Sequence, residues 1–211
     1  MITELLQGLA VSVEIFAFTL LLSLPLGFAV ALGRMSGNPV VSCFFRVYVS
    51  VTRGTPLMLQ IIFVYYAPYY MFGLPLARYP RIMATVLAFA INYSAYFGEI
   101  YRGGILSIET GQWEGAKSLG LSQARTFFRI ILPQTIKRVI PAVGNEVITL
   151  VKDTSLAFTI AVTEMFTIAR QISSARTTIA PLLVAGLFYY IFNFIVEQVM
   201  ARIEKSLSYY H

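Results

Sequence analysis

Long apolar runs are the feature that most limits how this chain can fold. Five stretches of about 20 residues are predominantly apolar: residues 10–32, 57–77, 82–102, 139–163 and 179–200. A helix of that length crosses the roughly 30 Å hydrocarbon core of a bilayer. Charged residues make up only 12% of the chain, against about 25% in soluble domains. We therefore predict an all-α membrane protein, with five transmembrane helices in a single domain that comprises residues 1–211.

The positions of Lys and Arg predict the orientation of these helices, because short cytoplasmic loops carry an excess of both. One side holds eleven of the 16 cations: Arg34, Arg46, Arg53, Arg102, Lys117, Arg125, Arg129, Lys137, Arg138, Arg202 and Lys205. The other side holds Arg78, Arg81, Arg170 and Arg176. We expect the first side to be cytoplasmic, with the N-terminus outside and the C-terminus inside. The net charge of +6 lies between apolar runs, so no nucleic-acid partner is expected.

Scarcity of Cys and His excludes several classes of site. Cys43 and His211 are the only members of their types, so no intrachain disulfide and no Cys/His metal site is expected. A Ser-His-Asp triad would need its base on the last residue, and no catalytic residue is predicted. The first nine residues contain Glu4 and no Lys or Arg, so we expect the first apolar run to remain in the mature protein.

The loop between the third and fourth runs carries helix signals. Thr110 and Ser122 are suitable N-cap residues for two short helices, and Gly120 can end the first of them in a left-handed conformation. Pro133 is expected to end or kink the second. This pattern predicts a helix-turn-helix over residues 107–135 on the cytoplasmic face. A solvated connector between two spans would show the same pattern.

The residues of this loop resemble the EAA motif of bacterial ATP-binding-cassette (ABC) importer permeases, which reads E-A-A, three residues, G, nine residues, I-x-L-P. Here it reads Glu114-Gly115-Ala116, then Gly120, then Ile130-Ile131-Leu132-Pro133, with Gly115 as the one departure. Four further segments are similar to signatures of the polar amino-acid permease subfamily: Arg53-Gly54-Thr55-Pro56-Leu57 with Gln60, Ser94-Ala95-Tyr96 with Glu99, Arg102-Gly103-Gly104-Ile105 and Lys152-Asp153-Thr154-Ser155-Leu156.

This resemblance implies the type I (MetI-like) permease fold and a role in amino-acid uptake. Its first loop helix, the coupling helix, would dock in a cytoplasmic ABC ATPase dimer through Trp113, Glu114, Gly115, Ala116, Lys117, Gly120 and Pro133. The other implied partners are a second permease subunit, identical or homologous, and an extracytoplasmic amino-acid-binding protein. ATP and Mg²⁺ would be used by the ATPase, and this chain, which lacks a G-x-x-x-x-G-K-[ST] loop, would bind no cofactor.

Polar residues inside the spans mark a candidate substrate path, because ionisable groups there normally face a bundle interior or a water-filled route. Asn92, Tyr96 and Glu99 follow at helical spacing in the third run. A similar stripe follows the fourth run, although Lys152 and Asp153 point about 100° apart on a regular helix and must each reach other partners. The predicted path comprises Gln60, Asn92, Tyr96, Glu99, Asn145, Thr149, Lys152, Asp153, Ser155 and Glu164. Structural struts that tie helices together are the alternative interpretation of each residue.

Two other functions are compatible with intramembrane carboxylates. An ion-coupled secondary transporter of small polar solutes would use them as proton or sodium sites, although five spans without an internal repeat argue against it. A membrane hydrolase could pair Glu99 with Asp153, but no motif supports it. The tyrosines at 65, 66, 69 and 70 predict an aromatic belt at the outer interface or, alternatively, a gate.

Overall fold

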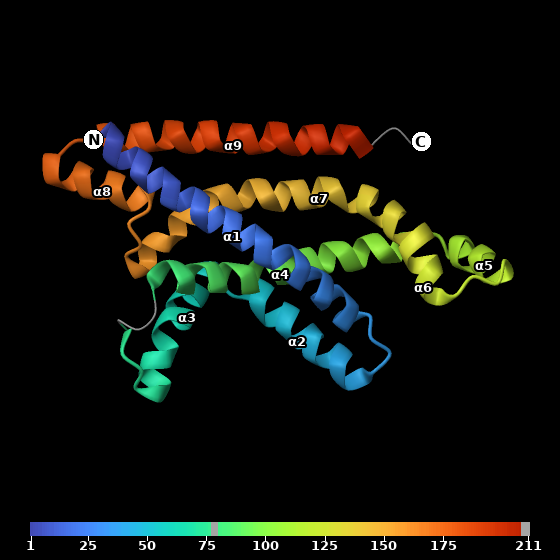
Figure 1. The fold of residues 1–211 in the computed structure, drawn as a ribbon. Helices are drawn as coiled ribbons and strands as arrows, with labels where there is room; N and C mark the ends of the chain where they lie inside the picture. The colour runs from blue at the N-terminus through green and yellow to red at the C-terminus, as the bar shows by residue number, and fades with distance from the viewer. Residues whose placement is uncertain (77–79, 208–211) are drawn as a thin grey trace.

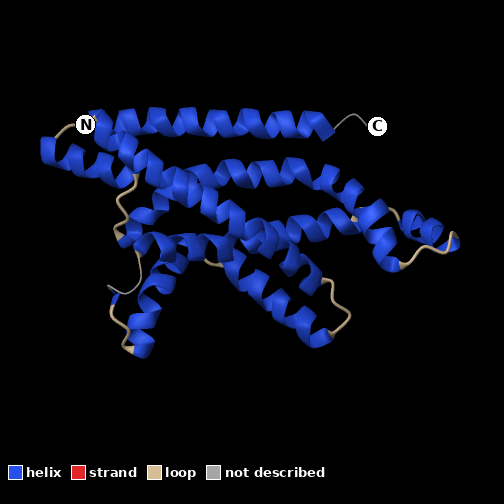
Figure 2. Cartoon of the chain, in the orientation of Figure 1, coloured by secondary structure: helices blue, strands red, loops and turns tan. Residues whose placement is uncertain are grey.

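The computed structural model describes residues 1–76 and 80–207, so Arg78 and His211 lie outside the described residues. Helices and connecting segments make up this described part, which contains no strand (Figure 2). In chain order the elements are α1 (Ile2–Arg34), α2 (Pro39–Gly54), α3 (Leu57–Phe72), α4 (Arg81–Leu106), α5 (Thr110–Ser118), α6 (Gln123–Thr126), the π-helical turn η2 (Phe127–Ile131), α7 (Leu132–Asp153), the 3₁₀ segment η3 (Thr154–Ile160), α8 (Met165–Arg176) and α9 (Ala180–Leu207). The all-α prediction is confirmed.

Four long helices form the body of the molecule. Helix α1 packs along α4, α4 packs against α7, and α7 packs against α9. The short helices α5 and α6 project at one end, where α1, α4 and α9 also end, whereas α8 lies at the opposite end (Figure 1). The centre of the core is the aromatic face of α4, where Phe89, Tyr93 and Phe97 are fully buried.

Glycines set the closest approach between α1 and α4. A Cβ atom placed on Gly98 would lie 2.6 Å from Cγ1 of Val30 and 3.3 Å from the carbonyl oxygen of Gly27. Small residues at a helix crossing let the two backbones approach, which is how helices pack where lipid supplies no hydrophobic drive. This crossing anchors the end of α4 that carries several polar side chains.

By length and composition, α1 and α9 are each able to cross a membrane, and α2 with α3 meets the same criterion as a pair bent by 110°. The second run differs from its prediction of residues 57–77, because α3 ends at Phe72 and a separate helix, α2, precedes it. The signals for α2 are local: Asn38 Oδ1 accepts from the backbone N–H of Val40 (2.9 Å) and Pro39 occupies the first helical position.

The predicted helix-turn-helix is present over α5 and α6. Gly120 has φ of +72°, its N–H donates to the Lys117 carbonyl, and the Leu121 N–H donates to the Ala116 carbonyl, which is the Schellman pattern. Ser122 caps α6 as expected. Thr110 was wrong as a cap, because α5 begins at Thr110 itself and no side chain caps it.

Pro133 does not end a helix. It occupies the second position of α7, directly after η2, so the chain stays helical from Gln123 to Asp153. A proline lacks the backbone donor that a helix interior requires. A π-helical turn, η2, immediately precedes α7, and a kink at Pro133 stays a prediction.

Candidate functional site

The break between α2 and α3 is held by one glutamine. Gln60 Nε2 lies 2.8 Å from the Thr52 carbonyl oxygen, 3.1 Å from the Thr55 carbonyl oxygen and 2.9 Å from Thr55 Oγ1. Its Oε1 accepts from Nδ2 of the buried Asn92 on α4, at 3.1 Å. The carbonyls that the break leaves without helical partners are therefore satisfied by side chains, which permits a sharp bend within the molecule. The structure thus brings together the predicted path residues Gln60 and Asn92.

This break also positions a cation that sequence reasoning assigned to a cytoplasmic loop. The guanidinium carbon of Arg53 lies 5.0 Å from the ring centroid of Tyr96, a cation–π distance. Tyr96 precedes the end of α4 by ten residues, which is about 15 Å along the helix. Arg53 therefore lies beside α4 and belongs to helix α2 instead of a loop, with its side chain exposed. Its side of the membrane stays a prediction.

Acidic groups of α7 complete the arrangement. Glu146 interacts electrostatically with Arg53 and with Asp153. Asp153, the last residue of α7, accepts a hydrogen bond of 2.7 Å from the hydroxyl of Tyr93, while Lys152 stays exposed. Asp153 thus reaches another helix as expected, whereas a separate partner for Lys152 stays a prediction.

We define the polar face as Arg53, Tyr96, Glu146, Lys152 and Asp153. It contains two cations and two carboxylates, from the α2–α3 break, α4 and the end of α7. The predicted path residues Asn145 and Thr149 are exposed on α7, and Ser155 donates to the Lys152 carbonyl at 2.8 Å. Side chains of both signs can bind a ligand that carries both a carboxylate and an ammonium group.

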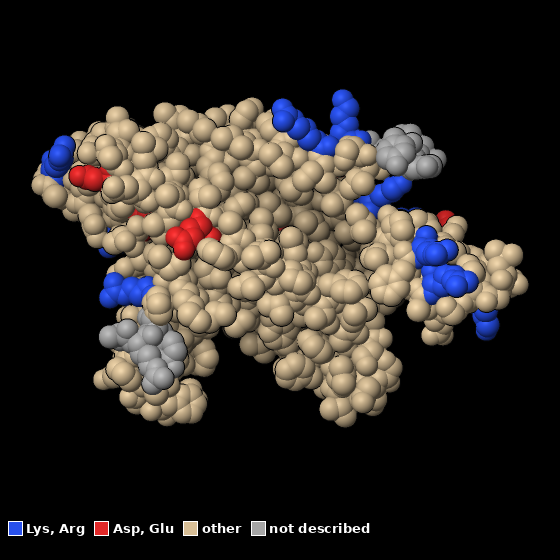
Figure 3. All heavy atoms as spheres, viewed as in Figure 1, with Lys and Arg blue, Asp and Glu red and all other residues tan. Residues whose placement is uncertain are grey.

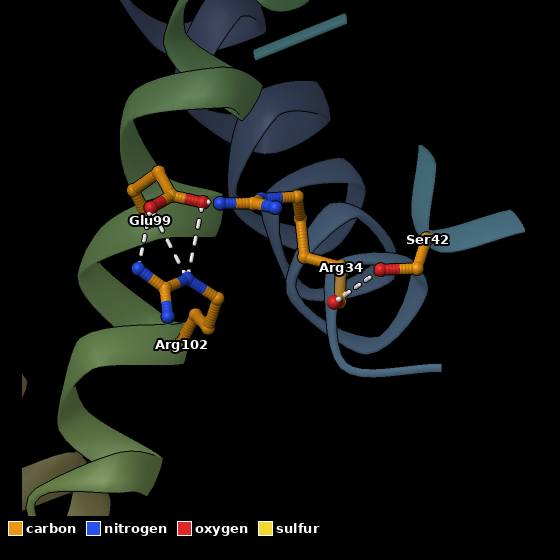
Figure 4. A network of polar contacts seen from close by, with 4 residues as sticks. All are labelled: Arg34, Ser42, Glu99 and Arg102. Atoms are coloured by element: carbon orange, nitrogen blue, oxygen red, sulfur yellow. Dashed lines mark hydrogen bonds and ion pairs between the residues drawn. The ribbon is translucent and has the colours of Figure 1, made fainter. Parts of the chain in front are cut away.

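Glu99 lies outside the polar face. Its Oε1 is 2.8 Å from Nε of Arg34, and its Oε2 is 2.8 Å from Nη2 of Arg102. Figure 4 shows both guanidinium groups converging on this carboxylate where α1 and α4 end. Glu99 and Asp153 are therefore bound to different partners. The helical spacing placed Glu99 on the same side of α4 as Asn92, but seven residues separate them by about 10 Å along the axis.

Glu164 is also separate, because its carboxylate acts as the N-cap of α8. It is 0% exposed and accepts from the backbone N–H groups of Phe166 (2.6 Å) and Thr167 (2.7 Å), from Thr167 Oγ1 (2.9 Å) and from the Tyr189 hydroxyl (3.0 Å). Burial raises the pKa of the Glu164 carboxyl, and these hydrogen bonds oppose the rise. The side chain fastens α8 to α9.

The predicted coupling residues gather on α5 and at its turn. Ala116 is buried, and Trp113 packs against Ile105, Ile108 and Ile131. Glu114, Gly115, Lys117 and Gly120 are exposed. A cavity of about 270 Å³ lies on this hairpin, lined by Trp113, Glu114, Lys117, Leu121, Gln123 and Thr126. Pro133 is exposed on α7, beyond the hairpin.

The predicted path left out Arg53 and Glu146 of the polar face, and also Tyr93, which donates to Asp153. Tyr93 falls one residue after Asn92 and so appeared to belong to another side of the helix. Arg53 stands in the Arg53-Gly54-Thr55-Pro56 segment, where Gly and Pro are signals for a helix break. Recognising that the break places Arg53 beside Tyr96 would have required knowing the Gln60 hydrogen bonds.

Comparison with known proteins gives consistent matches. Residues 23–209 match the family described as binding-protein-dependent transport system inner membrane component. An octopine transport system permease protein of Rhizobium radiobacter is 37% identical over 217 residues, covering 96% of this chain and 85% of the relative. An L-cystine transport system permease protein of Bacillus subtilis is 36% identical, covering 96% and 86%. The crystal structure of an amino acid ABC transporter with histidines superposes with a TM-score of 0.88 at 29% identity, covering 97% of this chain and 94% of that one.

Proposed function

This chain belongs to the family of binding-protein-dependent transport system inner membrane components, and from that membership we propose that it is the permease subunit of an ABC importer for amino acids. The family expected from the EAA motif is confirmed. Relatives that transport octopine and L-cystine, each matched over 96% of this chain, support an amino-acid-type substrate. Such a subunit is a transport component of the inner membrane and not an enzyme.

The observation that carries the substrate class is the composition of the polar face. Arg53 and Lys152 offer positive partners for a carboxylate, and Glu146 and Asp153 offer negative partners for an ammonium group. Charges within a membrane span are costly unless they serve a pathway or pair with one another. We propose that an amino acid passes along the polar face and that the flanking residues Asn145, Thr149 and Ser155 also line its path.

The polar face of one chain is open, so the proposed path needs a second wall. Lys152, Thr149 and Asn145 are exposed on α7, and lipid would be an unfavourable neighbour for them. A second copy of this chain, or a homologous subunit, would cover this face and complete the path. In this arrangement α1, the α2–α3 pair, α4, α7 and α9 are the five spans, with the N-terminus outside. Helices α4 and α7 have 26 and 22 residues, about 39 and 33 Å, which is long enough to cross.

Coupling to ATP hydrolysis is assigned to α5. This helix is short, its Glu114 and Lys117 side chains are exposed, and the left-handed conformation of Gly120 ends it in a tight turn. Trp113 packs against the cluster that contains Ile105 of α4 and Ile131 of η2, so a displacement of α5 would reach the spans. The ATPase dimer would hold ATP and Mg²⁺, and an extracytoplasmic binding protein would deliver the substrate on the other side.

Transport by the assembled complex tests this proposal. The chain is co-expressed with its ATPase and reconstituted in proteoliposomes, and uptake of each of the twenty amino acids is measured with the binding protein present. Asp153→Asn is expected to abolish uptake while ATPase co-purification is retained, and Glu204→Gln, an exposed acid on α9, is the matched control. Undiminished uptake by the Asp153→Asn complex would contradict the path. Uptake driven by an ion gradient without any ATPase would instead favour a secondary transporter.

A further inference from the structure

A second charged cluster lies away from the polar face and has no part in the proposed path. A pocket of about 450 Å³ opens where α1 and α4 end, lined by Arg34, Met35, Arg46, Arg102 and Leu106. Arg34 is the last residue of α1, Arg102 lies four residues before the end of α4, and Arg46 comes from the middle of α2. Ser42 Oγ donates to the Arg34 carbonyl at 3.1 Å (Figure 4) and so holds the start of α2 against the end of α1.

The pocket carries excess positive charge. Glu99 is the carboxylate bonded to Arg34 and Arg102, so three guanidinium groups and one carboxylate leave a net charge of +2. Glu99 engages Nε of Arg34, and Nε and one terminal nitrogen of Arg102. Their other terminal N–H groups remain available. Arg46 is exposed, and within the described residues it makes no hydrogen bond or ion pair.

The arginines of this pocket are preorganised for an anion. The side chains of Arg34 and Arg102 are only 17% and 30% exposed, and their hydrogen bonds to Glu99 hold both in place. Guanidinium groups held in a fixed position match the geometry of phosphate oxygens and bind them bidentately. An anion placed here would therefore gain charge-assisted hydrogen bonds without first having to order these two side chains.

The position of the pocket favours a membrane lipid as the source of the anion. Arg34 is the last residue of the 33-residue α1, at the same end of the molecule as α5 and α6 (Figure 1). In the proposed orientation this end lies at the cytoplasmic headgroup layer. Beside Arg46, an apolar stripe of α2 points away from the molecule, formed by Val40, Phe44, Val47 and Val51, which are 56–75% exposed. An acyl chain could lie along it.

We propose that this arginine pocket binds the phosphate group of an anionic phospholipid from the cytoplasmic leaflet. Basic pockets between membrane helices recognise such headgroups through charge and hydrogen bonds. Bound there, the lipid would neutralise part of the excess charge and link the ends of α1, α2 and α4. A zwitterionic lipid has a cationic group beside its phosphate and would be the poorer ligand.

Native mass spectrometry of the full-length chain in detergent tests this site. Equimolar phosphatidylglycerol and phosphatidylcholine with the same acyl chains are added, and singly bound adducts are compared. Phosphatidylglycerol adducts should dominate. Arg46→Gln should weaken phosphatidylglycerol binding about fivefold, which corresponds to about 1 kcal/mol for one basic residue near an anionic surface, and Arg46→Lys should retain most of it. Arg202→Gln, which removes an exposed arginine of α9, is the matched control and should bind normally.

Three results would overturn the proposal. The first is equal binding of the two lipids by the unaltered chain. The second is an identical loss with Arg46→Gln and Arg202→Gln, which would indicate general attraction to a positive protein. The third is displacement of phosphatidylglycerol by inorganic phosphate at the same concentration, which would identify a free anion as the ligand. Arg46 has no partner among the described residues, so its variants should elute normally from size-exclusion columns.

Discussion

The crossing of α1 and α4 supports a quantitative prediction for Gly98→Ala. The new Cβ atom would lie 2.6 Å from Val30 Cγ1 and 2.9 Å from Val30 Cβ, whereas carbon atoms in contact sit about 3.5–4.0 Å apart. The two helices must separate by about 1 Å or Val30 must leave its position. Overpacking of this kind typically costs about 1–3 kcal/mol.

Gly103→Ala is the matched control, because it lies on the same helix and nothing lies within 4 Å of its added Cβ. Both substitutions gain about 1 kcal/mol of helix propensity, so their difference isolates the clash with Val30. We expect Gly98→Ala to be less stable than Gly103→Ala by about 1–3 kcal/mol. Each kcal/mol lowers the unfolding midpoint by about 2–4 °C for a chain of this size.

The assay is the loss of monodisperse protein after heating in detergent, followed by size-exclusion chromatography. The double variant Val30→Ala/Gly98→Ala should recover part of the lost midpoint temperature, because the shortest of the three contacts, at 2.6 Å to Cγ1, disappears with the valine methyls while the 2.9 Å contact with Cβ remains. Equal midpoints for Gly98→Ala and Gly103→Ala would refute the tight crossing. Failure of the double variant to recover would show that Val30 is not the obstacle.

Three other substitutions test separate parts of the molecule. Gly120 has φ of +72°, so Gly120→Val should destabilise the turn by at least about 1–2 kcal/mol and reduce the stimulation of ATP hydrolysis by the loaded binding protein. Gly115→Ala, where nothing lies within 4 Å of the added Cβ, should preserve that stimulation. Equal stimulation of the two complexes would contradict the coupling role. Glu164→Ala leaves buried donors of α8 unpaired and should cost about 1–3 kcal/mol for each, with a smaller loss for Glu164→Gln, as measured by thermal unfolding. Tyr93→Phe removes the 2.7 Å hydrogen bond to Asp153 and should weaken substrate binding by the assembled complex. The free energy of unfolding should fall by no more than about 1.5–3 kcal/mol. Unchanged substrate affinity would argue against a role of this pair in binding.

Local signals account for the parts of the structure that were predictable. The turn at Gly120 and the cap at Ser122 depend on residues within a few positions of each other, so their pattern is visible in the sequence. The aromatic contacts among Tyr65, Tyr66 and Tyr70 likewise follow from neighbouring turns of one helix. The aromatic belt and its alternative, a gate, both stay predictions.

Long-range contacts account for the parts that were not. The position of Arg53 depends on the bend that Gln60 stabilises, and its partner Tyr96 is 43 residues away in sequence. Glu164 looked like one more charge at the end of a span, but four hydrogen bonds make it a buried cap. Glu99 lies on the same side of α4 as Asn92, but its carboxylate forms ion pairs with Arg34 and Arg102.

Apolar runs and turn residues by themselves indicated a helical membrane protein with a helix-turn-helix that closes at Gly120, because hydrophobicity and turn geometry act over short stretches of chain. The spacing of the EAA motif indicated the permease family to which the chain belongs. Only the tertiary structure decided how the charges are divided among a polar face, an arginine pocket and a helix cap. That division depends on which helix each charged side chain meets. Burial makes an unpaired charge costly, so its partner, and hence its role, is selected by the packing of the helices and not by its position in the sequence.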